Sequence, residues 1–484
     1  MLSFWQKLSA QPFSTVTLLS LVLFLSGTWL LPLIDRDEPR FAQASREMLQ
    51  RGDLVIPWFN GHYRFDKPPL IYWCQMGCYR LLGENTFSAR LPSVLFATAT
   101  ALLFVAWGRR LGNEASGFCA AMIFITCLQV LIHARLAVGD MPMVFFATAA
   151  VWSGWEMTRP QVVRNALWCW FFFVSLALGF LAKGPIAWFP LGGLLIGKWC
   201  RPADFRLSMK WLLPGLLVTV ALVALWGIPA LVKTHGEFFA VGIGHHVVYR
   251  SFGVMEGHGV NGILGWLFST PFYFLGVFLS FFPWAFTLPK ALRSWWPTRR
   301  QDTLGWYLLV QIALVFGVFT IVRTKLPHYT LPAFPCLSLW LARWLAKEEK
   351  WLSWTAKWAL AMSLVALLLT SLGFVAARPL FVSASLWRQV RPMAKSDMAM
   401  AAVGFQEPSL VWEFHQVLTN QMESLPLAKA AEFLRREQPL VLVLPTSEFK
   451  EPLPALAANA VKIRVIGLDT VEFKKRDLTA IVRQ

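Results

Sequence analysis

The chain has 484 residues, of which 56% are hydrophobic and only 15% are charged, with 25 Trp and 39 Phe. A soluble protein of this length usually carries about a quarter charged residues, so the composition excludes a soluble globular protein and indicates a polytopic membrane protein. The formal net charge of +18 would suit a nucleic-acid partner, but the basic residues stand in short clusters between apolar segments. Membrane topology produces that distribution, and we expect membrane lipids and no nucleic acid as partners.

The first apolar segment covers residues 13–33 and contains no charged residue. It is longer than the core of a signal peptide and has no small-residue cleavage site. We therefore predict that it is retained as a transmembrane helix.

An outer loop with structure of its own follows from Asp35 to about Arg80. Within it, residues 39–51 place Phe41 and Met48 on one helical face and polar residues on another. This pattern predicts an amphipathic helix that lies flat on the membrane.

Ionisable side chains gather around that helix. Asp37 and Glu38 stand directly before it, where they could act in catalysis or where Asp37 could simply cap the helix. Lys67 is followed by Pro68 and Pro69, which remove two backbone donors and stiffen the chain. That arrangement suits a lysine with a fixed direction, although a lysine that reaches to the membrane interface is the alternative.

Apolar windows of about 20 residues, the length that crosses a hydrocarbon core, recur to about Arg378 and predict eleven spans. Clusters of Lys and Arg follow each even-numbered window, namely Arg109–Arg110, Arg159 with Arg164, Lys198 to Lys210, Lys290 to Arg300, and Arg343 to Lys350. Cytoplasmic loops collect basic residues, so we expect the N-terminus inside and the C-terminus outside. Most acids of the membrane region then lie in outer loops, which favours chemistry at the outer surface over a transport pathway at mid-membrane.

The character of the chain changes after residue 379. The runs "PLVLVLP" and "VKIRVIGL" predict strands, and "PLAKAAEFLRREQ" predicts a helix. We therefore expect a membrane domain over residues 1–379 and a small α/β domain over residues 380–484 outside the membrane. In fold class the chain is an all-α polytopic membrane protein with a C-terminal α/β domain.

Several stretches of the chain resemble one family in the same order. They are "DRDEPRFAQASREMLQRGDLVIPWFNGHYRFDKPPLIYW", "ARLAVGDMPMVFF", "GFLAKGPIAWFP", "GHGVNGILGWLFSTPFYF" and "TKLPHYTLPAFP". Together they resemble the GT-C membrane glycosyltransferases related to bacterial lipid A 4-amino-4-deoxy-L-arabinose transferase and to protein O-mannosyltransferases. The resemblance implies transfer of a sugar from a polyprenyl (undecaprenyl) phosphate to lipid A or another envelope glycan or protein. It also implies a bacterial inner-membrane protein whose active site and C-terminal domain are periplasmic.

The resemblance also implies roles for individual residues. Asp37 is the catalytic acid of the first loop, with Glu38 beside it and Asp140 as a partner from the second outer loop, although Asp35 could compete with Asp37. Basic and polar residues are expected to hold the donor phosphate or to line the same substrate cavity: Lys67, Lys183, Lys325, Tyr329, His258 and Arg250.

The residue types also indicate which cofactors to expect and leave one alternative function open. No Gly-rich phosphate loop is present, so we expect no nucleotide cofactor. His258 with Glu256, and the pair His245–His246, have side chains that bind a divalent metal ion, although polar interfacial loop residues are the alternative. A polyprenyl-linked sugar flippase without transfer activity would share the spans and the basic cavity, and it is the alternative to an enzyme.

Overall fold

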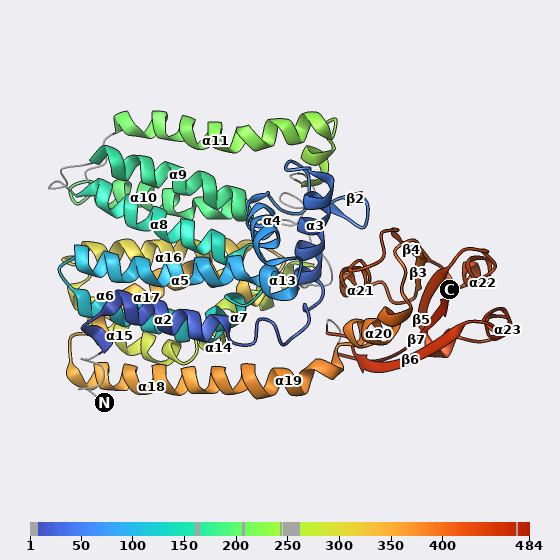
Figure 1. The fold of residues 1–484 in the computed structure, drawn as a ribbon. Helices are drawn as coiled ribbons and strands as arrows, with labels where there is room; N and C mark the ends of the chain where they lie inside the picture. Colours follow the sequence, from blue (N-terminus) through green and yellow to red (C-terminus); the bar gives the residue numbers. More distant parts are fainter. Residues whose placement is uncertain (1–7, 160–164, 206–208, 243, 245–261, 471–472) are drawn as a thin grey trace. The chain divides into compact units, whose positions relative to one another are not determined.

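The computed structural model describes all residues except 1–7, 160–164, 206–208, 243, 245–261 and 471–472 (Figure 1). The chain forms two compact units, each built from several segments. The first unit comprises residues 1–26, 65–71 and 90–367, and we call it the helical unit. The second comprises residues 27–64, 72–89 and 368–484, and we call it the mixed unit because it contains helices and a sheet.

The helical unit is a bundle of apolar helices (Figure 1). Its main helices are α2 (Pro12–Leu25), α5 (Thr86–Arg110), α6 (Glu114–Thr126), α8 (Asp140–Thr158), α9 (Asn165–Lys183), α10 (Phe189–Cys200), α11 (Leu212–Lys233), α14 (Phe272–Ser280), α16 (Thr303–Ile321), α17 (Phe334–Leu345) and α18 (Glu349–Leu368). Helix α9 packs between α8 and α11, and α16 packs against α10 and α17. This set of apolar helices confirms the predicted class, a helical polytopic membrane protein.

Helices of spanning length are fewer than the predicted spans. Five described helices are long and apolar enough to cross a membrane, or six if one bent pair counts as a single span. The predicted first span of residues 13–33 is wrong in its length, because α2 ends at Leu25 and the residues after it leave the helix. The count of eleven spans stays a prediction.

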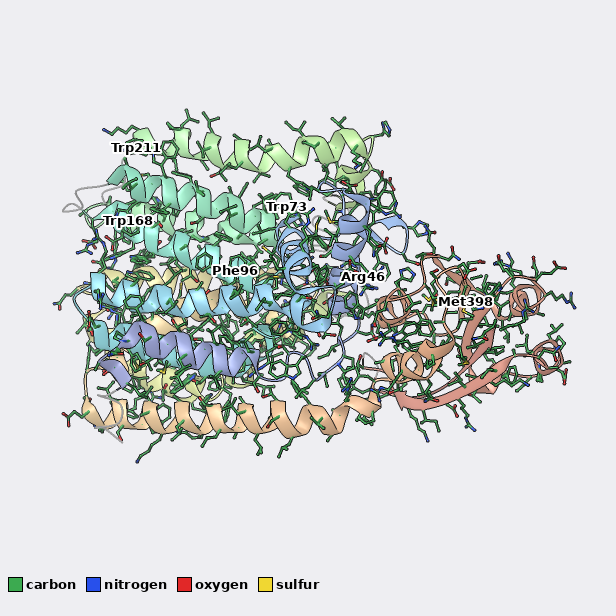
Figure 2. All side chains as sticks on the ribbon, in the orientation of Figure 1. Arg46, Trp73, Phe96, Trp168, Trp211 and Met398 are labelled. Carbon is green, nitrogen blue, oxygen red and sulfur yellow. The ribbon has the colours of Figure 1, made fainter. Side chains whose placement is uncertain are left out.

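One end of the bundle carries tryptophans and arginines. Trp168 and Trp211 lie at this end (Figure 2), and the Arg110 guanidinium stands 5.3 Å from the ring centre of Trp168. Arg110 also forms a salt bridge of 3.1 Å with the buried Glu156, near the end of α8. Trp and basic residues concentrate at a membrane–water interface, so this end marks one interface.

A five-stranded mixed sheet forms the core of the mixed unit. Its strands lie in the order β4 (Met422–Leu425), β3 (Ala399–Val403), β5 (Leu440–Pro445), β7 (Lys475–Arg483) and β6 (Val461–Leu468). Strand β3 pairs in parallel with β4 and β5, whereas β7 is antiparallel to β5 and β6. Both faces of the sheet are covered by apolar clusters. The central β5 is therefore buried along almost its whole length, while the edge strand β6 alternates between buried and exposed residues.

The predicted elements of the C-terminal region are confirmed. The run "PLVLVLP" forms β5 and "VKIRVIGL" forms β6. The predicted helix is present but short, as a 3-10 turn over Leu427–Lys429 followed by α22 (Ala430–Leu434). Two further helices, α20 (Val382–Val390) and α21 (Pro408–Phe414), cover the sheet in the same unit.

Most of the first loop belongs to the mixed unit, as does the C-terminal segment, whereas residues 65–71 belong to the helical unit. The amphipathic helix of this loop is confirmed as α3 (Asp37–Arg51), which packs against α21. The polar residues Gln43, Arg46 and Glu47 of α3 are buried. Gln43 Nε2 donates to Glu47 Oε1 at 2.9 Å, and Arg46 Nη1 donates to Gln43 Oε1 at 2.8 Å. The Arg46 guanidinium also stacks on Trp412 of α21, 3.7 Å from the ring centre.

Candidate active site

Asp140 and Lys183 meet at one end of the helical unit. Asp140 is the first residue of α8 and Lys183 is the last residue of α9. Because these consecutive helices pack against each other, the start of one lies beside the end of the other. The Lys183 ammonium donates a hydrogen bond to Asp140 Oδ1, and only 5% of Asp140 is exposed.

Two glycines permit this approach. A Cβ atom added at Gly139, directly before Asp140, would stand 2.8 Å from the carbonyl oxygen of Ala182. Gly184, directly after Lys183, has a φ of +86°, which glycine adopts far more readily than other residues. The "GD" and "KG" pairs in the sequence therefore have a backbone reason as well as a chemical one.

The charge of Lys183 controls the acid. The two side chains form an ion pair in which the Lys183 ammonium compensates the charge of the buried Asp140 carboxylate. Asp140 is therefore already engaged by a lysine.

Two histidines complete the cluster around Asp140. The rings of His133 and His328 have their centres 5.3 Å apart, and both act on the charge of Asp140. Burial, followed by the charge of Lys183, lowers the pKa of His328 well below its ordinary value. His328 is therefore a neutral imidazole.

A cavity of about 660 Å³ opens beside this cluster, with all of its lining in the helical unit. The polar side chains at its wall are those of one acid, two lysines, a histidine and a tyrosine: Asp66, Lys67, Lys183, His328 and Tyr329. The rest of the wall is mostly apolar and includes Phe65, Phe180, Phe189, Val223, Trp226, Leu231, Phe238, Val318, Phe319 and Pro332. Its volume lies within the range of small-molecule sites, which is about 300–1,000 Å³.

The composition of the cavity decides what it can hold. Two lysines at one apolar wall fit an anionic headgroup that is joined to a long hydrocarbon chain. Aromatic rings support that wall, since Trp226 packs on Phe238 at 5.1 Å between ring centres and Phe65 packs on Phe238 at 6.0 Å. The cavity therefore has the chemistry of a lipid-phosphate site.

Lys325 has a different environment from the other two lysines. Its Nζ donates hydrogen bonds to the carbonyl oxygens of Phe319, Thr320 and Val322, at 2.8, 2.7 and 2.6 Å. It is not among the residues that line the cavity. A lysine that binds the last carbonyls of a helix stabilises its C-terminus, so Lys325 closes the end of α16.

Asp35, Asp37 and Glu38 of the first loop lie in the mixed unit, whereas Asp140 lies in the helical unit. Asp37 is exposed in the first turn of α3, and the N-cap residue is Arg36, without a side-chain cap. The interpretation of Asp37 as the cap is therefore wrong. Glu38 is buried and accepts a hydrogen bond of 2.9 Å from the backbone N–H of Ile34. The convergence of Asp37 on Asp140 stays a prediction.

Asp35 has a structural partner of its own. Its Oδ1 accepts a hydrogen bond of 2.8 Å from the backbone N–H of Ser409, next to α21. Burial raises the pKa of the Asp35 carboxyl to about 7. Of the two aspartates, Asp37 is thus the one that is exposed.

Three predicted residues, Arg250, Glu256 and His258, and the pair His245–His246, lie outside the described residues. Among the residues that are described, no group of three His, Cys, Asp or Glu side chains could hold a metal ion.

Sequence reasoning missed His133, His328 and the aromatic wall at Trp226. His328 stands inside the run "TKLPHYTLPAFP", next to the predicted Tyr329, and this position was the available signal. His133 precedes the motif with Asp140 and carries no signal by itself.

Comparison with known proteins gives a consistent family. The family model for dolichyl-phosphate-mannose-protein mannosyltransferases matches residues 11–245. An uncharacterised protein of Aquifex aeolicus is 30% identical over 334 residues, which cover 69% of this chain and 73% of that protein. The undecaprenyl phosphate-alpha-4-amino-4-deoxy-L-arabinose arabinosyl transferase of Pectobacterium atrosepticum is 31% identical over 329 residues, which cover 67% of this chain. This match spans 57% of the length of the transferase.

Solved structures show the same fold. The crystal structure of ArnT from Cupriavidus metallidurans bound to undecaprenyl phosphate superposes with a TM-score of 0.78 at 17% identity, covering 96% of this chain and 97% of that one. The archaeal oligosaccharyltransferase AglB from Archaeoglobus fulgidus superposes with a TM-score of 0.58 at 11% identity, covering 94% of this chain and 72% of that one. The chain therefore belongs to the GT-C family of membrane glycosyltransferases, of the type that includes the aminoarabinose transferases and the protein mannosyltransferases.

Proposed function

We propose that the chain transfers a sugar from a polyprenyl phosphate, such as undecaprenyl phosphate, to an acceptor in the bacterial envelope. The observation that carries this proposal is the apolar cavity at which Lys67 and Lys183 lie. A polyprenyl phosphate has the matching parts, namely a long hydrocarbon chain and one anionic headgroup. Similarity to undecaprenyl-phosphate arabinosyl transferases, and to a fold with undecaprenyl phosphate bound, supports this donor.

The two lysines act on the leaving group. During transfer, the bond between the anomeric carbon and the phosphate oxygen breaks as an acceptor oxygen attacks the anomeric carbon. Negative charge builds up on the departing lipid phosphate, and the ammonium groups of Lys67 and Lys183 stabilise it. The apolar wall strengthens each of these contacts, because charges interact more strongly where the effective dielectric constant is low.

A carboxylate has to take a proton if the acceptor is a hydroxyl group. We assign this role to Asp37, with Glu38 beside it in the same helical turn. Asp140 already accepts a hydrogen bond from Lys183, and Asp35 accepts one from Ser409. Asp140 is thus a positioning residue that holds Lys183, while Asp37 is the acid that is exposed. If the acceptor is instead a phosphate of lipid A, it is already anionic and needs no base, and the carboxylates position other groups or hold a metal ion instead.

The distribution of charge supports the periplasmic face of the inner membrane as the place of the proposed reaction. Arg110 pairs with Glu156 near the last turn of α8, whereas Asp140 is the first residue of that helix. Basic clusters such as Arg109–Arg110 mark the cytoplasmic side, so the Asp140 end faces outside. Lipid A, another envelope glycan and a protein are the acceptors available there.

The test uses the full chain in lipid vesicles with a radiolabelled sugar on undecaprenyl phosphate. Wild type is compared with Lys67→Met and with Lys210→Met, which removes an exposed lysine elsewhere in the helical unit. We expect transfer of label to lipid A by wild type and by Lys210→Met, and strongly reduced transfer by Lys67→Met. Movement of the labelled donor across the bilayer without transfer would overturn the proposal in favour of a flippase.

A further inference from the structure

The mixed unit contains a second cavity, of about 340 Å³, which the proposed reaction does not use. All of its lining residues belong to the mixed unit. They come from the chain after α2, from the start of α5 and from the C-terminal segment: Trp29, Leu30, Leu31, Pro32, Glu84, Asn85, Thr86, Arg378, Ala384, Trp387, Arg388, Arg391, Trp412, Glu413 and Gln416. We call it the arginine pocket.

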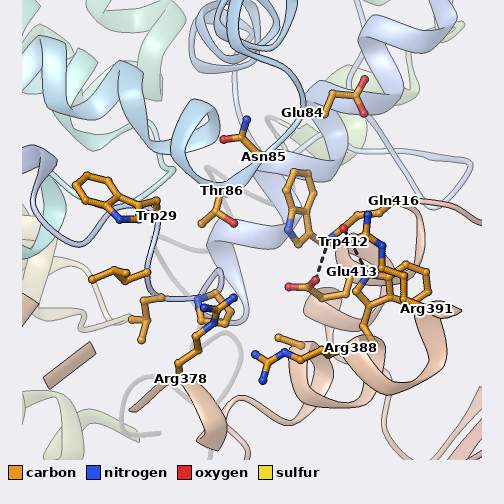
Figure 3. Close-up of a pocket in the computed structure, with 15 residues that line it drawn as sticks. Trp29, Glu84, Asn85, Thr86, Arg378, Arg388, Arg391, Trp412, Glu413 and Gln416 are labelled. Atoms are coloured by element: carbon orange, nitrogen blue, oxygen red, sulfur yellow. Dashed lines mark hydrogen bonds between the residues drawn. The ribbon is translucent and has the colours of Figure 1, made fainter. Parts of the chain in front are cut away.

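Three arginines give the pocket its charge. Arg378, Arg388 and Arg391 stand on successive short helices of the C-terminal segment and are exposed. Within the described residues, their guanidinium groups form no hydrogen bond and no salt bridge. Figure 3 shows Arg378 and Arg388 on one side of the space that Trp29 and Trp412 border.

The acids at the pocket do not cancel that charge. Glu84 is paired with Arg46 at 2.9 Å, so its charge is already compensated. Glu413 accepts a hydrogen bond of 2.9 Å from Gln416 Nε2 and is buried. Three unpaired guanidinium groups therefore stand against a single carboxyl group without an arginine partner, that of Glu413. The pocket consequently favours an anion.

The tryptophans indicate what the anion is attached to. Trp29 is 57% exposed, so its ring is open to a ligand in the pocket. Trp387 is held by a hydrogen bond of 3.3 Å from its indole N–H to Gln416 Oε1, and Arg46 covers one face of Trp412. Flat aromatic faces pack against the C–H groups of sugar rings, and arginine forks bind phosphate oxygens in pairs.

We propose that the arginine pocket binds a phosphorylated saccharide, with its phosphate on Arg378 and Arg388 and its sugar ring against Trp29. The assignment of this ligand as the headgroup of the acceptor rests on the proposed function. The binding itself does not. The volume of about 340 Å³ is at the lower end of the range for small-molecule sites, and it suits one sugar phosphate rather than a whole glycolipid.

Binding is measured first, on the full chain in detergent, by isothermal titration with glucosamine 1-phosphate and with uncharged glucosamine. The test variant is Arg378→Gln with Arg388→Gln, and Arg388→Gln alone is the milder form. The control is Arg435→Gln with Lys450→Gln, which removes two positive charges from exposed positions elsewhere in the mixed unit. Thermal unfolding of each variant shows that the fold is kept.

We expect the double variant to bind glucosamine 1-phosphate about tenfold or more weakly, because the phosphate loses charge-assisted hydrogen bonds, which are stronger than neutral ones. The control should bind like wild type, and glucosamine should bind weakly to every variant. Equal affinity of wild type and the double variant for the phosphorylated sugar would overturn the proposal.

The source of the ligand is separated in nanodiscs, with a phosphorylated glycolipid and its dephosphorylated form. A lipid-borne ligand predicts that the phosphorylated glycolipid competes with glucosamine 1-phosphate and that the double variant raises the acceptor KM but not the donor KM. A free sugar phosphate as ligand predicts no competition by the glycolipid, which would overturn the assignment to the acceptor. If no variant transfers sugar, the proposed function fails, while the binding measurement still decides on the pocket.

Discussion

Lys183, at the end of α9, donates a hydrogen bond to Asp140, at the start of α8. Asp140 is buried, whereas Lys183 is half-buried and also lines the cavity. A phosphate that enters the cavity therefore meets an ammonium group whose direction is already set. Asp140 supplies that direction and compensates the lysine charge while the cavity is empty.

The first prediction concerns this pair. Lys183→Met removes a countercharge for the leaving phosphate, and we expect transfer to slow by about 10²–10³-fold, the loss that follows removal of one donor at a developing charge. Asp140→Asn keeps a hydrogen-bond acceptor but leaves the lysine charge uncompensated, so we expect a smaller loss. Because the residues touch, their effects should not add, and the double variant should be no slower than Lys183→Met alone. Additive losses in the measured kcat/KM would contradict a shared role.

The second prediction concerns Gly139. A methyl group there would stand 2.8 Å from the Ala182 carbonyl oxygen, so Gly139→Ala should push the start of α8 away from the end of α9. We expect lower thermal stability together with reduced transfer. Gly276→Ala is the matched control, since Gly276 lies in α14, away from the cavity lining, and a Cβ atom there meets nothing within 4 Å. It should leave transfer unchanged and stabilise the helix by up to about 1 kcal/mol. Similar behaviour of the two variants would show that the close approach at Gly139 does not matter.

Sequence reasoning reached the elements that depend on local pattern. The helical period of α3 and the apolar runs of β5 and β6 were correct because neighbouring residues carry those signals. The buried face of α3 could not be predicted in this way, since it depends on Trp412, a residue far along the chain. The sequence pattern of a polar helix face is the same whether that face contacts water or other buried polar groups.

The residues of the candidate site also fall into two groups: those that a local motif reveals and those that only the fold brings together. Asp140 and Lys183 were identified through short motifs, and the structure brings them into contact. The contact of His133 with His328 joins two distant segments and leaves no local pattern. The motif around Lys325 predicts a lysine that binds phosphate. In the structure, however, its side chain folds back onto the backbone carbonyls at the end of α16.

The third prediction separates Lys325 from Lys67. Lys325→Met removes three hydrogen bonds to the last carbonyls of α16, and a buried carbonyl that loses its partner destabilises the fold. We expect the midpoint of thermal unfolding to fall by several degrees, with the affinity for the donor little changed in the protein that stays folded. Lys67→Met should show the reverse, with donor affinity reduced and unfolding nearly unchanged. Donor titration and thermal unfolding in the same detergent check both, and a weaker donor affinity in Lys325→Met at unchanged stability would return it to the phosphate site.

The last prediction concerns pH and the mixed unit. Burial raises the pKa of Asp35 from 3.8 to about 7 in the folded chain, so the folded state binds a proton more tightly than the unfolded one. The stability linked to this proton is fully present below about pH 3.8 and is lost as pH rises through about 7. Asp35→Asn keeps an oxygen that can accept from the Ser409 N–H and removes the titration. We therefore expect this variant to gain stability relative to wild type as pH increases from 5 to 8, measured by thermal unfolding of the full chain in detergent.

Asp477→Asn is the control for that pH series, because its linkage has the opposite sign. Hydrogen bonds from Arg464 and Thr446 lower the pKa of Asp477 to about 2, so its contribution is present above about pH 3.8 and is lost only as pH falls through about 2. Between pH 5 and 8, the unfolding midpoint of Asp477→Asn should differ from that of wild type by a constant amount. A constant difference for Asp35→Asn as well would mean that Asp35 is charged throughout this range, and that burial against the Ser409 segment does not hold a proton on it.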